Sequence, residues 1–178
     1  MIRMTDLHPD DLTARLNLRN MLTERRTDLG YSQTAIGHHI GLSQGAIAHL
    51  ETRTNWHIAV LQRYARGLNT RILLYPADLP GGPYDDPTAD LFRPTDPDRA
   101  DQWDQQQLLL NLAAARQAAQ LTQRQVGDAL GSSESAVGNY ERTKTGLMLI
   151  AAQRYCRAIG GRLALELAHL DEPAEVAA

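Results

Sequence analysis

An internal repeat is the feature of this sequence that most limits what the chain can fold into. The segment YSQTAIGHHIGLSQGAIAHLE, which begins at Tyr31, aligns without gaps with LTQRQVGDALGSSESAVGNYE, which begins at Leu121, at an offset of 90 positions. With one extra residue the match continues from QRYARGLNTRILLY, at Gln62, to QRYCRAIGGRLALE, at Gln153. Two copies of a unit of about sixty residues are expected to adopt one fold twice.

Within each copy, apolar residues recur at helical spacing in short segments separated by glycine or small polar residues. This pattern predicts a compact bundle of about five helices. A short strand is expected to end each copy, at 71–75 and 162–167, because helix-stop residues precede these segments at Leu68-Asn69 and Gly160-Gly161. The predicted fold class is all-α, with two helical bundles that each end in a short β-strand.

Domain boundaries follow from the repeat and from composition. We expect a first domain at 1–75, an acidic linker at 76–104, a second domain at 105–170 and an acidic tail at 171–178. The linker combines prolines, glycines and aspartates with little periodic apolar content, which is typical of a spacer.

The formal net charge of -3 hides a difference in sign between segments. Residues 14–75 hold eight arginines against three acidic residues, and residues 108–165 hold seven basic residues against three acidic ones. In contrast, residues 76–107 hold eight aspartates against two arginines. Both copies are therefore basic modules, a charge balance that suits polyanion binding.

Residues 33–50 have the spacing of a helix-turn-helix: a short helix, a glycine turn and a second helix held against the first. Gly37 is expected where the two helices approach closely, and Gly41 is expected to take a positive φ. The second copy places Gly127 and Gly131 at these positions. The buried inner face is expected to comprise Ile36, Ile40, Ile47 and Leu50 in the first copy and Val126, Leu130, Val137 and Tyr140 in the second.

Through the patterns TQ-x-x-hydrophobic-G/A and G-x-S-x-x-x-I/V-x-x-hydrophobic-E, the chain resembles the Cro- and phage-repressor-like (XRE-type) helix-turn-helix regulators. The resemblance implies two lambda-repressor-like bundles and sequence-specific binding of double-stranded DNA by a transcriptional regulator, usually a repressor. One position departs from the family. Ser132 stands where the family usually has an apolar residue and the first copy has Leu42, which predicts a looser second turn.

The resemblance also implies roles for individual residues. An arginine late in the first helix is expected to form a structural ion pair with a glutamate that ends the third, as Arg26 with Glu51 and Arg116 with Glu141. The start of the reading helix enters the major groove in such folds. The base-reading residues are then expected to be Ser43, Gln44, Gly45, His49, Ser133, Glu134, Ser135 and Asn139. Phosphate contacts are expected from Gln33, Arg53, Thr54, Gln123, Arg142, Thr143 and Lys144. For each of these groups, a solvated surface position stays an alternative.

Some XRE-type antitoxins, which this chain resembles in its terminal strands, pair such strands with those of a partner. Here the two strands are expected to pair within one chain, which makes a pseudo-dimer suited to an asymmetric inverted-repeat operator. An antitoxin-like or adaptor protein whose main role is protein interaction stays an alternative. A toxin or polymerase as protein partner, and a homodimer, also stay open.

Other classes of function have little support in the sequence. The single cysteine, Cys156, predicts no disulfide or thiolate metal cluster and indicates a reducing cytosol. Neither a nucleophile motif nor a Gly-rich phosphate loop occurs, so no enzyme, cofactor or metal is expected. The adjacent pair His38-His39 lacks further ligands nearby. With no apolar segment long enough for a bilayer, a cytoplasmic, nucleoid-associated protein is expected.

Overall fold

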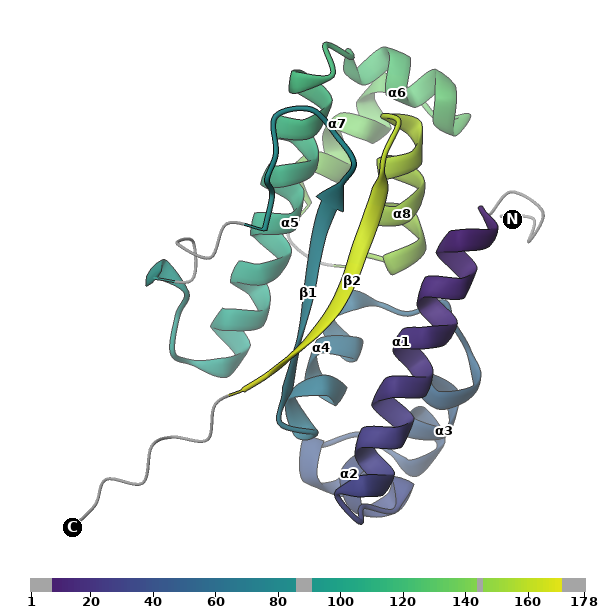
Figure 1. Cartoon of the computed structure of the whole chain (residues 1–178), viewed down its shortest axis with the longest axis vertical. Coiled ribbons are helices and arrows are strands. Elements are labelled where there is room, and N and C mark those ends of the chain that lie inside the picture. The colour runs from purple at the N-terminus through teal and green to yellow at the C-terminus, as the bar shows by residue number, and fades with distance from the viewer. Residues whose placement is uncertain (1–7, 86–90, 144–145, 171–178) are drawn as a thin grey trace.

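The structure is a computed structural model, which describes residues 8–85, 91–143 and 146–170. In this part of the chain, the same order of elements occurs twice: four helices, then one strand (Figure 1). The predicted acidic tail, 171–178, lies outside the described residues. The first set is α1 (Pro9–Asp28), α2 (Gln33–Ile40), α3 (Gln44–Thr52), α4 (Ile58–Gly67) and β1 (Thr70–Ala77). The second set is α5 (Pro97–Ala118), α6 (Gln123–Leu130), α7 (Glu134–Arg142), α8 (Leu149–Ala158) and β2 (Arg162–His169).

The prediction of a mainly helical chain with two short strands is confirmed. The expected number of about five helices per copy is wrong, because the described residues contain four in each. The first helix of each copy is one long, uninterrupted element, and the last helix is followed directly by the strand. Both expected helix stops are present, since Asn69 has a φ of 56° and Gly160 a φ of 95°.

The segment that the sequence assigns to a linker is shorter in the structure. Residues 76 and 77 complete β1, and residues 97–104 form the first turns of α5. Asp96 caps α5 by accepting a hydrogen bond from the backbone N–H of Arg99 at 2.9 Å, and Pro97 occupies the first turn. Both are helix-start signals. We call residues 78–96, between β1 and α5, the connecting segment. Arg93 fixes the end of this segment to α5 through two hydrogen bonds of 2.9 Å with Asp104.

The two strands pair with each other in an antiparallel sheet along their whole length. In the register, Leu74 lies opposite Leu165. These two residues are also equivalents in the repeat, which has an offset of 91 in this part of the chain. The pairing of residues is therefore symmetric about Leu74 and Leu165. Each strand also covers one hydrogen-bonding edge of the other.

A second contact of the same kind lies where the last helices begin. His57 and Met148, which are repeat equivalents, form an antiparallel bridge. On either side of it the backbone bonds are reciprocal: the N–H of Ile58 donates to the carbonyl of Leu147 at 2.8 Å, and the N–H of Leu149 donates to the carbonyl of Trp56 at 3.0 Å. Each copy therefore donates one backbone hydrogen bond to the other and accepts the equivalent bond from it.

The first helix of each copy reaches across to the last helix of the other. The side-chain amide of Gln153, on α8, donates to the carbonyl of Asp11, on α1, at 3.1 Å. The equivalent bond joins Gln62, on α4, to the carbonyl of Asp101, on α5, at 3.2 Å. Figure 1 shows α1 running from beside α2 and α3 to beside α8. The two copies therefore share one continuous interface rather than meeting only at the sheet.

Ion pairs accompany both crossings. Arg157 binds the carboxylate of Asp11 with its nearest atoms 2.7 Å apart, and the equivalent Arg66 lies 3.0 Å from the carboxylate of Asp101. Asp11 is almost fully buried. Within the described residues, none of the helices is long and apolar enough to cross a membrane.

Candidate nucleic-acid interface

A left-handed glycine forms the turn between α2 and α3, and the second copy repeats it between α6 and α7. Gly41 has a φ of 70° and Gly131 a φ of 64°, so the predicted positive φ is confirmed at both. At Gly37, a Cβ atom would lie 2.6 Å from the carbonyl oxygen of Leu42, and at Gly127 the corresponding distance is 2.9 Å. Any side chain at these positions would force the turn away from the preceding helix.

Ser132 does not loosen the backbone of the second turn. Its N–H donates to the carbonyl of Gly127 at 2.8 Å, as the N–H of Leu42 does to Gly37 at 2.8 Å. The difference lies in the side chains: Leu42 packs against the core, whereas Ser132 is exposed. A cavity of about 210 Å³ lies beside Ser132, with Tyr140 in its wall. The second turn therefore differs from the first in the packing of its side chain and not in its backbone.

The two helices predicted to read bases, α3 and α7, each begin at a serine cap. The Oγ atoms of Ser43 and Ser133 accept hydrogen bonds of 3.1 Å from the backbone N–H groups of Ala46 and Ala136. This arrangement satisfies a backbone donor that the helix itself cannot. Both serines are among the predicted base-reading residues, and the structure adds the capping role. The hydroxyl of Ser43 can still donate its hydrogen to a nucleic acid, whereas the hydroxyl of Ser133 also shares a hydrogen bond of 3.0 Å with that of Ser135.

A buried glutamate at the end of α3 holds the helices of the first copy together. Arg26 donates from Nε and Nη2 to the two carboxylate oxygens of Glu51, at 2.6 and 3.1 Å. Gln33 donates to the same carboxylate at 2.8 Å, and the hydroxyl of Tyr64 donates to it as well. The remaining terminal nitrogen of Arg26 donates to the carbonyl of Tyr31. We call Arg26, Gln33, Glu51 and Tyr64 the first glutamate cluster.

The second glutamate cluster comprises Arg116, Gln123, Glu141 and Tyr155, at the equivalent positions. Arg116 donates to both carboxylate oxygens of Glu141, at 2.7 and 3.1 Å. Gln123 donates to this carboxylate at 2.8 Å, and the hydroxyl of Tyr155 also donates to it. The two clusters therefore have the same four residue types and the same pattern of donors.

The electrostatics of the two clusters agree with their geometry. The side chains of Glu51 and Glu141 are only 6% and 7% exposed. Burial alone would raise the pKa of each carboxyl, but the hydrogen bonds from the arginine, tyrosine and glutamine outweigh it, so both pKa values are lowered. Glu51 and Glu141 therefore remain charged, and each can anchor the last turn of its reading helix.

In the first copy, the predicted base-reading side chains lie on the outer surface of α3. Gln44, Gly45 and His49 are all exposed. The side-chain amide of Gln44 donates to Oε1 of Gln33 at 2.8 Å, and Gln33 is itself held by Glu51. A chain of hydrogen bonds thus joins the reading surface to the buried cluster. Gly45 offers no side chain, so any contact it makes is through its backbone.

The reading helix of the second copy lacks this link. Glu134 occupies the position of Gln44, and a carboxylate has no N–H to donate to Gln123. Glu134, Ser135 and Asn139 are exposed. Asn139 accepts a long hydrogen bond of 3.4 Å from Arg142. The two reading helices therefore present different chemistry from the same scaffold.

Comparison with known proteins bears on the second copy. Residues 112–165 match a model of the helix-turn-helix family. The chain has an XRE-like helix-turn-helix domain there. This domain is a DNA-binding domain of transcription regulators and indicates no catalytic family. Searches among curated proteins and solved structures found no match.

In the helix-turn-helix domain and its repeat equivalent, the predicted phosphate-binding residues are spread over two places. Arg53 and Arg142 are exposed at the ends of α3 and α7, and Thr54 and Thr143 beside them are half-buried. Gln33 and Gln123 start α2 and α6, but their amide nitrogens already donate within the glutamate clusters. Lys144 lies outside the described residues.

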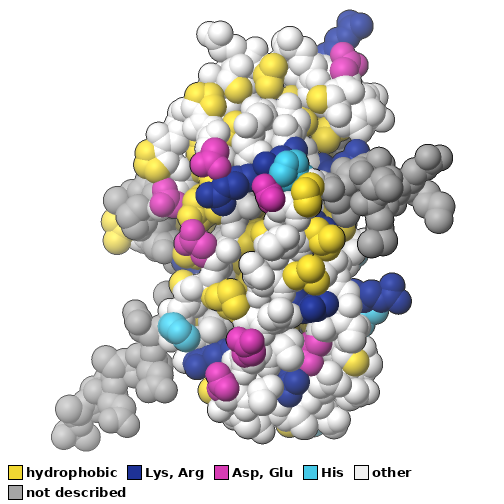
Figure 2. Space-filling view, turned by 45° about the vertical axis from the view of Figure 1, so that its right-hand side comes forward, with side chains coloured by type: hydrophobic (Ala, Val, Ile, Leu, Met, Phe, Trp, Pro, Cys, Tyr) yellow, Lys and Arg dark blue, Asp and Glu magenta, His cyan; other side chains and the backbone are white. Residues whose placement is uncertain are grey.

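Charge is not gathered into one field on the face that Figure 2 shows, where basic and acidic side chains are intermixed. Part of the positive charge of the first copy is neutralised by acidic residues of the second. Arg66 pairs with Asp98 and Asp101, and Arg71 pairs with Asp104, all from α5. The net charge counted for the first copy from its sequence therefore overstates the positive charge that this copy can present to a polyanion.

Sequence reasoning missed Tyr64 and Tyr155, which complete the glutamate clusters. A signal was present, because QRYARG and QRYCRA place the two tyrosines at equivalent positions of the repeat. It also missed the glutamines Gln62 and Gln153 that join the copies. These occur in the same two segments, but nothing in the sequence shows that they bond to the other copy.

Proposed function

We propose that this chain is a sequence-specific double-stranded DNA-binding transcriptional regulator in which both repeat copies act as helix-turn-helix units of a covalent pseudo-dimer. Its binding site would be an inverted-repeat operator with two unlike half-sites. Its action would be repression, by occupying a promoter or its own operator.

The observation that carries this proposal is the symmetry of the interface between the copies. Leu74 pairs with Leu165 and His57 pairs with Met148, and in each case a residue meets its own repeat equivalent. Two such contacts define a two-fold relation between the copies. An inverted repeat in DNA has two-fold symmetry, and paired helix-turn-helix units match it with their own.

The first copy supports the proposal through its glutamate cluster. The family match covers residues of the second copy. Yet the first copy has the same turn conformation, the same serine cap and the same cluster around Glu51. A segment built on the same contacts is suited to the same task.

The segments on either side of the His57–Met148 bridge also fit a role at the centre of an operator. Arg53 follows the last residue of α3 and stands four residues before this bridge, and Arg142 ends α7 six residues before it. We propose that these two arginines contact phosphates near the centre of the operator. The reading residues of α3 and α7 would face successive major grooves on either side, about one helical turn (~34 Å) apart.

Selection of bound duplexes from a random library tests the proposal. The expected result is a single site with two half-sites in inverted orientation, whose sequences differ because Gln44 faces one and Glu134 the other. Affinity should fall steeply with salt, because phosphate contacts release counterions. A direct repeat or a single half-site would contradict the pseudo-dimer. The absence of any selected sequence would favour the protein-binding alternative.

A further inference from the structure

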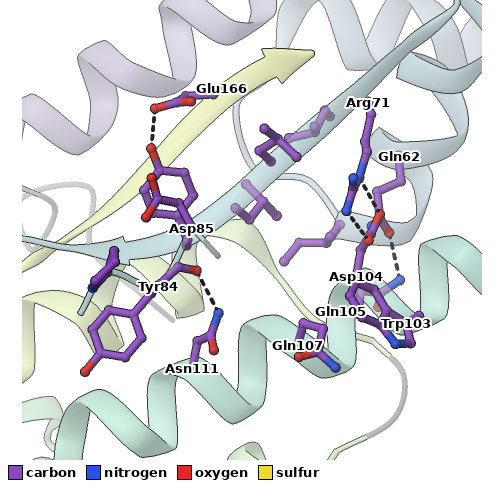
Figure 3. A pocket seen from close by; sticks show the side chains of 16 residues that line it. Gln62, Arg71, Tyr84, Asp85, Trp103, Asp104, Gln105, Gln107, Asn111 and Glu166 are labelled. Carbon is purple, nitrogen blue, oxygen red and sulfur yellow. Dashed lines mark hydrogen bonds and ion pairs between the residues drawn. The ribbon is translucent and has the colours of Figure 1, made fainter. Parts of the chain in front are cut away.

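A cavity of about 430 Å³ lies between the sheet and α5, beside the segment that connects the two copies (Figure 3). Its volume is in the range of small-molecule binding sites, about 300–1,000 Å³. Its walls come from both copies and from residues 83–85 of the connecting segment. No part of the proposed DNA interface lines it.

One wall of the cavity is apolar and another is polar. Leu73, which pairs with Glu166 in the sheet and shares its face with Tyr75, contributes the apolar side, and Trp103 contributes an aromatic ring. From α5, the amides of Gln107 and Asn111 face the same space, as Figure 3 shows. The amide of Asn111 donates to the carbonyl of Tyr84 at 3.0 Å, which ties the connecting segment to α5 at the rim.

The charges along the cavity are unevenly balanced. At one end, Asp104 is neutralised by Arg71 at 2.7 Å and by Arg93 at 2.9 Å. The other end has Asp85 and Glu166, and in the described part of the chain neither of these carboxylates forms an ion pair. The cavity thus has an excess of negative charge at its Asp85–Glu166 end.

Tyr75 lines the cavity together with those two carboxylates. Its hydroxyl donates to Glu166. This hydrogen bond, burial and the negative charges of Glu166 and Asp85 together raise the pKa of Tyr75 to about 12. The negative charges of Asp85 and Glu166 are therefore both felt at the hydroxyl of Tyr75, next to its aromatic ring. A cation beside an aromatic ring is also attracted by the ring's electrons.

We propose that this cavity binds a small organic cation with an aromatic or apolar body. The charged group would lie near Asp85 and Glu166 beside Tyr75, and the body would pack against Leu73 and Trp103. Because the walls belong to both copies, an occupant would bridge the interface that sets their relative positions. A role for such a cation as an effector of DNA binding rests on the proposed function.

The repeat offers a matched control for this cavity. Asn17, on α1, is the repeat equivalent of Gln107, on α5, and it is exposed. The connecting segment occurs once in the chain, so α1 does not face an equivalent wall made by it. A bulky side chain at Gln107 should therefore fill the cavity, whereas the same change at Asn17 should not.

Calorimetry of the full chain without DNA tests the proposal, with benzyltrimethylammonium, benzyl alcohol and benzoate as probes. The cation should bind about fivefold more tightly than the alcohol, and benzoate should bind most weakly. The double variant Asp85→Asn, Glu166→Gln, which keeps the side-chain sizes, should remove the preference for the cation and leave the affinity for the alcohol unchanged. Gln107→Trp should abolish binding of all three, and Asn17→Trp should not.

Equal affinities across the probe series, or a cation preference that survives the double variant, would overturn the proposal. So would the absence of binding at millimolar probe. Fluorescence of Trp103 in a Trp56→Phe background gives a second readout that stays useful if Gln107→Trp fails to fold, because Trp56 is buried away from the cavity. These measurements contain no DNA, so their outcome is separate from that of the proposed function.

An effect on DNA is then measured on its own. Saturating benzyltrimethylammonium should change the affinity for the selected operator at least threefold in the wild type and leave the double variant unaffected. An unchanged operator affinity, with probe binding intact, would overturn the effector role.

Discussion

The two copies of the repeat are alike in what holds them together and unlike in what they present to solvent. Both have a left-handed glycine turn, a serine cap and a glutamate held by arginine, glutamine and tyrosine. At the start of the reading helix, however, Gln44 is fixed by Gln33, whereas Glu134 has no such partner among the described residues. The scaffold and the reading surface therefore vary independently.

A second difference lies inside the copies. Leu42 fills its position in the first turn, and Ser132 leaves a cavity in the second. Leu50 in α3 is replaced by Tyr140 in α7, whose buried hydroxyl has no hydrogen-bond partner in the described structure. An unmade buried hydrogen bond costs about 1–3 kcal/mol. Both features are expected to lower the stability of the second copy around α7.

Breaking the glutamate clusters should have the largest effect on this comparison. Arg26→Ala and Arg116→Ala each leave a buried carboxylate without its cation, which should lower the free energy of unfolding by about 3–5 kcal/mol. Urea unfolding at neutral pH measures both losses. Similar losses are expected because the two clusters match. A loss below 1 kcal/mol in one copy would show that its cluster does not hold the fold.

The same clusters predict a loss of stability in acid. The folded-state pKa values of Glu51 and Glu141 are lowered from an ordinary value of 4.5. Their contribution is therefore complete above about pH 4.5 and disappears as the pH falls through the lowered values. Glu51→Gln and Glu141→Gln should be less stable than the wild type at pH 7, and the difference should shrink below pH 4. A constant difference would exclude the carboxylates as its source.

The reading surfaces should show the next largest effect. Gln44→Ala and Asn139→Ala should each weaken binding to the selected operator by about 1–3 kcal/mol while leaving non-specific binding almost unchanged. Gel-shift titrations on the operator and on a scrambled duplex measure both. Gln33→Ala sharpens the comparison, since it should weaken base readout by the first copy alone. If Gln44→Ala and Asn139→Ala both bind like the wild type, the reading helices are wrongly assigned.

Exchange of the turn residues should have a smaller effect, of opposite sign in the two copies. Leu42→Ser removes a partly buried side chain and should cost about 1–2 kcal/mol of stability. Ser132→Leu should fill the neighbouring cavity and add about 0.5–1 kcal/mol. Thermal unfolding of the two variants beside the wild type measures this. A destabilised Ser132→Leu would show that the second turn is packed as closely as the first.

The smallest effect is expected from the predicted phosphate-binding charges. Arg53→Ala, Arg142→Ala and Lys144→Ala should weaken binding to all sequences alike, and each should reduce the slope of log affinity against log salt by about 1. Titrations at several salt concentrations give the slope, with Arg19→Ala, a change on α1, as a control. A changed base preference with an unchanged slope would show that these side chains do not contact phosphates.

Much of each copy was predictable because its signals are local. The glycine turns and the helix stops at Asn69 and Gly160 depend on residues close together in the sequence. The start of α5 at Pro97 was also signalled locally, by Asp96 and Pro97, but the acidic composition of the segment favoured a linker. Composition was the weaker guide there, because several of those aspartates pair with arginines of the first copy.

The contacts between the copies could be predicted only in part. Pairing of the strands was expected, but the crossing of α1 to α8 and of α5 to α4 was not. These bonds join residues far apart in the chain, and Gln62 and Gln153 have no feature that distinguishes them from solvated glutamines. The base-reading and phosphate-binding assignments stay predictions, since they concern a ligand that must be present to test them.

The spacing of the two half-sites tests the central claim, that the copies form one two-fold unit on DNA, most directly. Footprinting would compare the selected operator with a version in which five base pairs are inserted between the half-sites. This half-turn places them on opposite faces of the duplex. Because the strand pair and the crossing helices fix the copies to each other, we predict that one half-site loses protection and affinity falls at least tenfold. Full protection of both half-sites with undiminished affinity would contradict the pseudo-dimer and show that the copies bind independently.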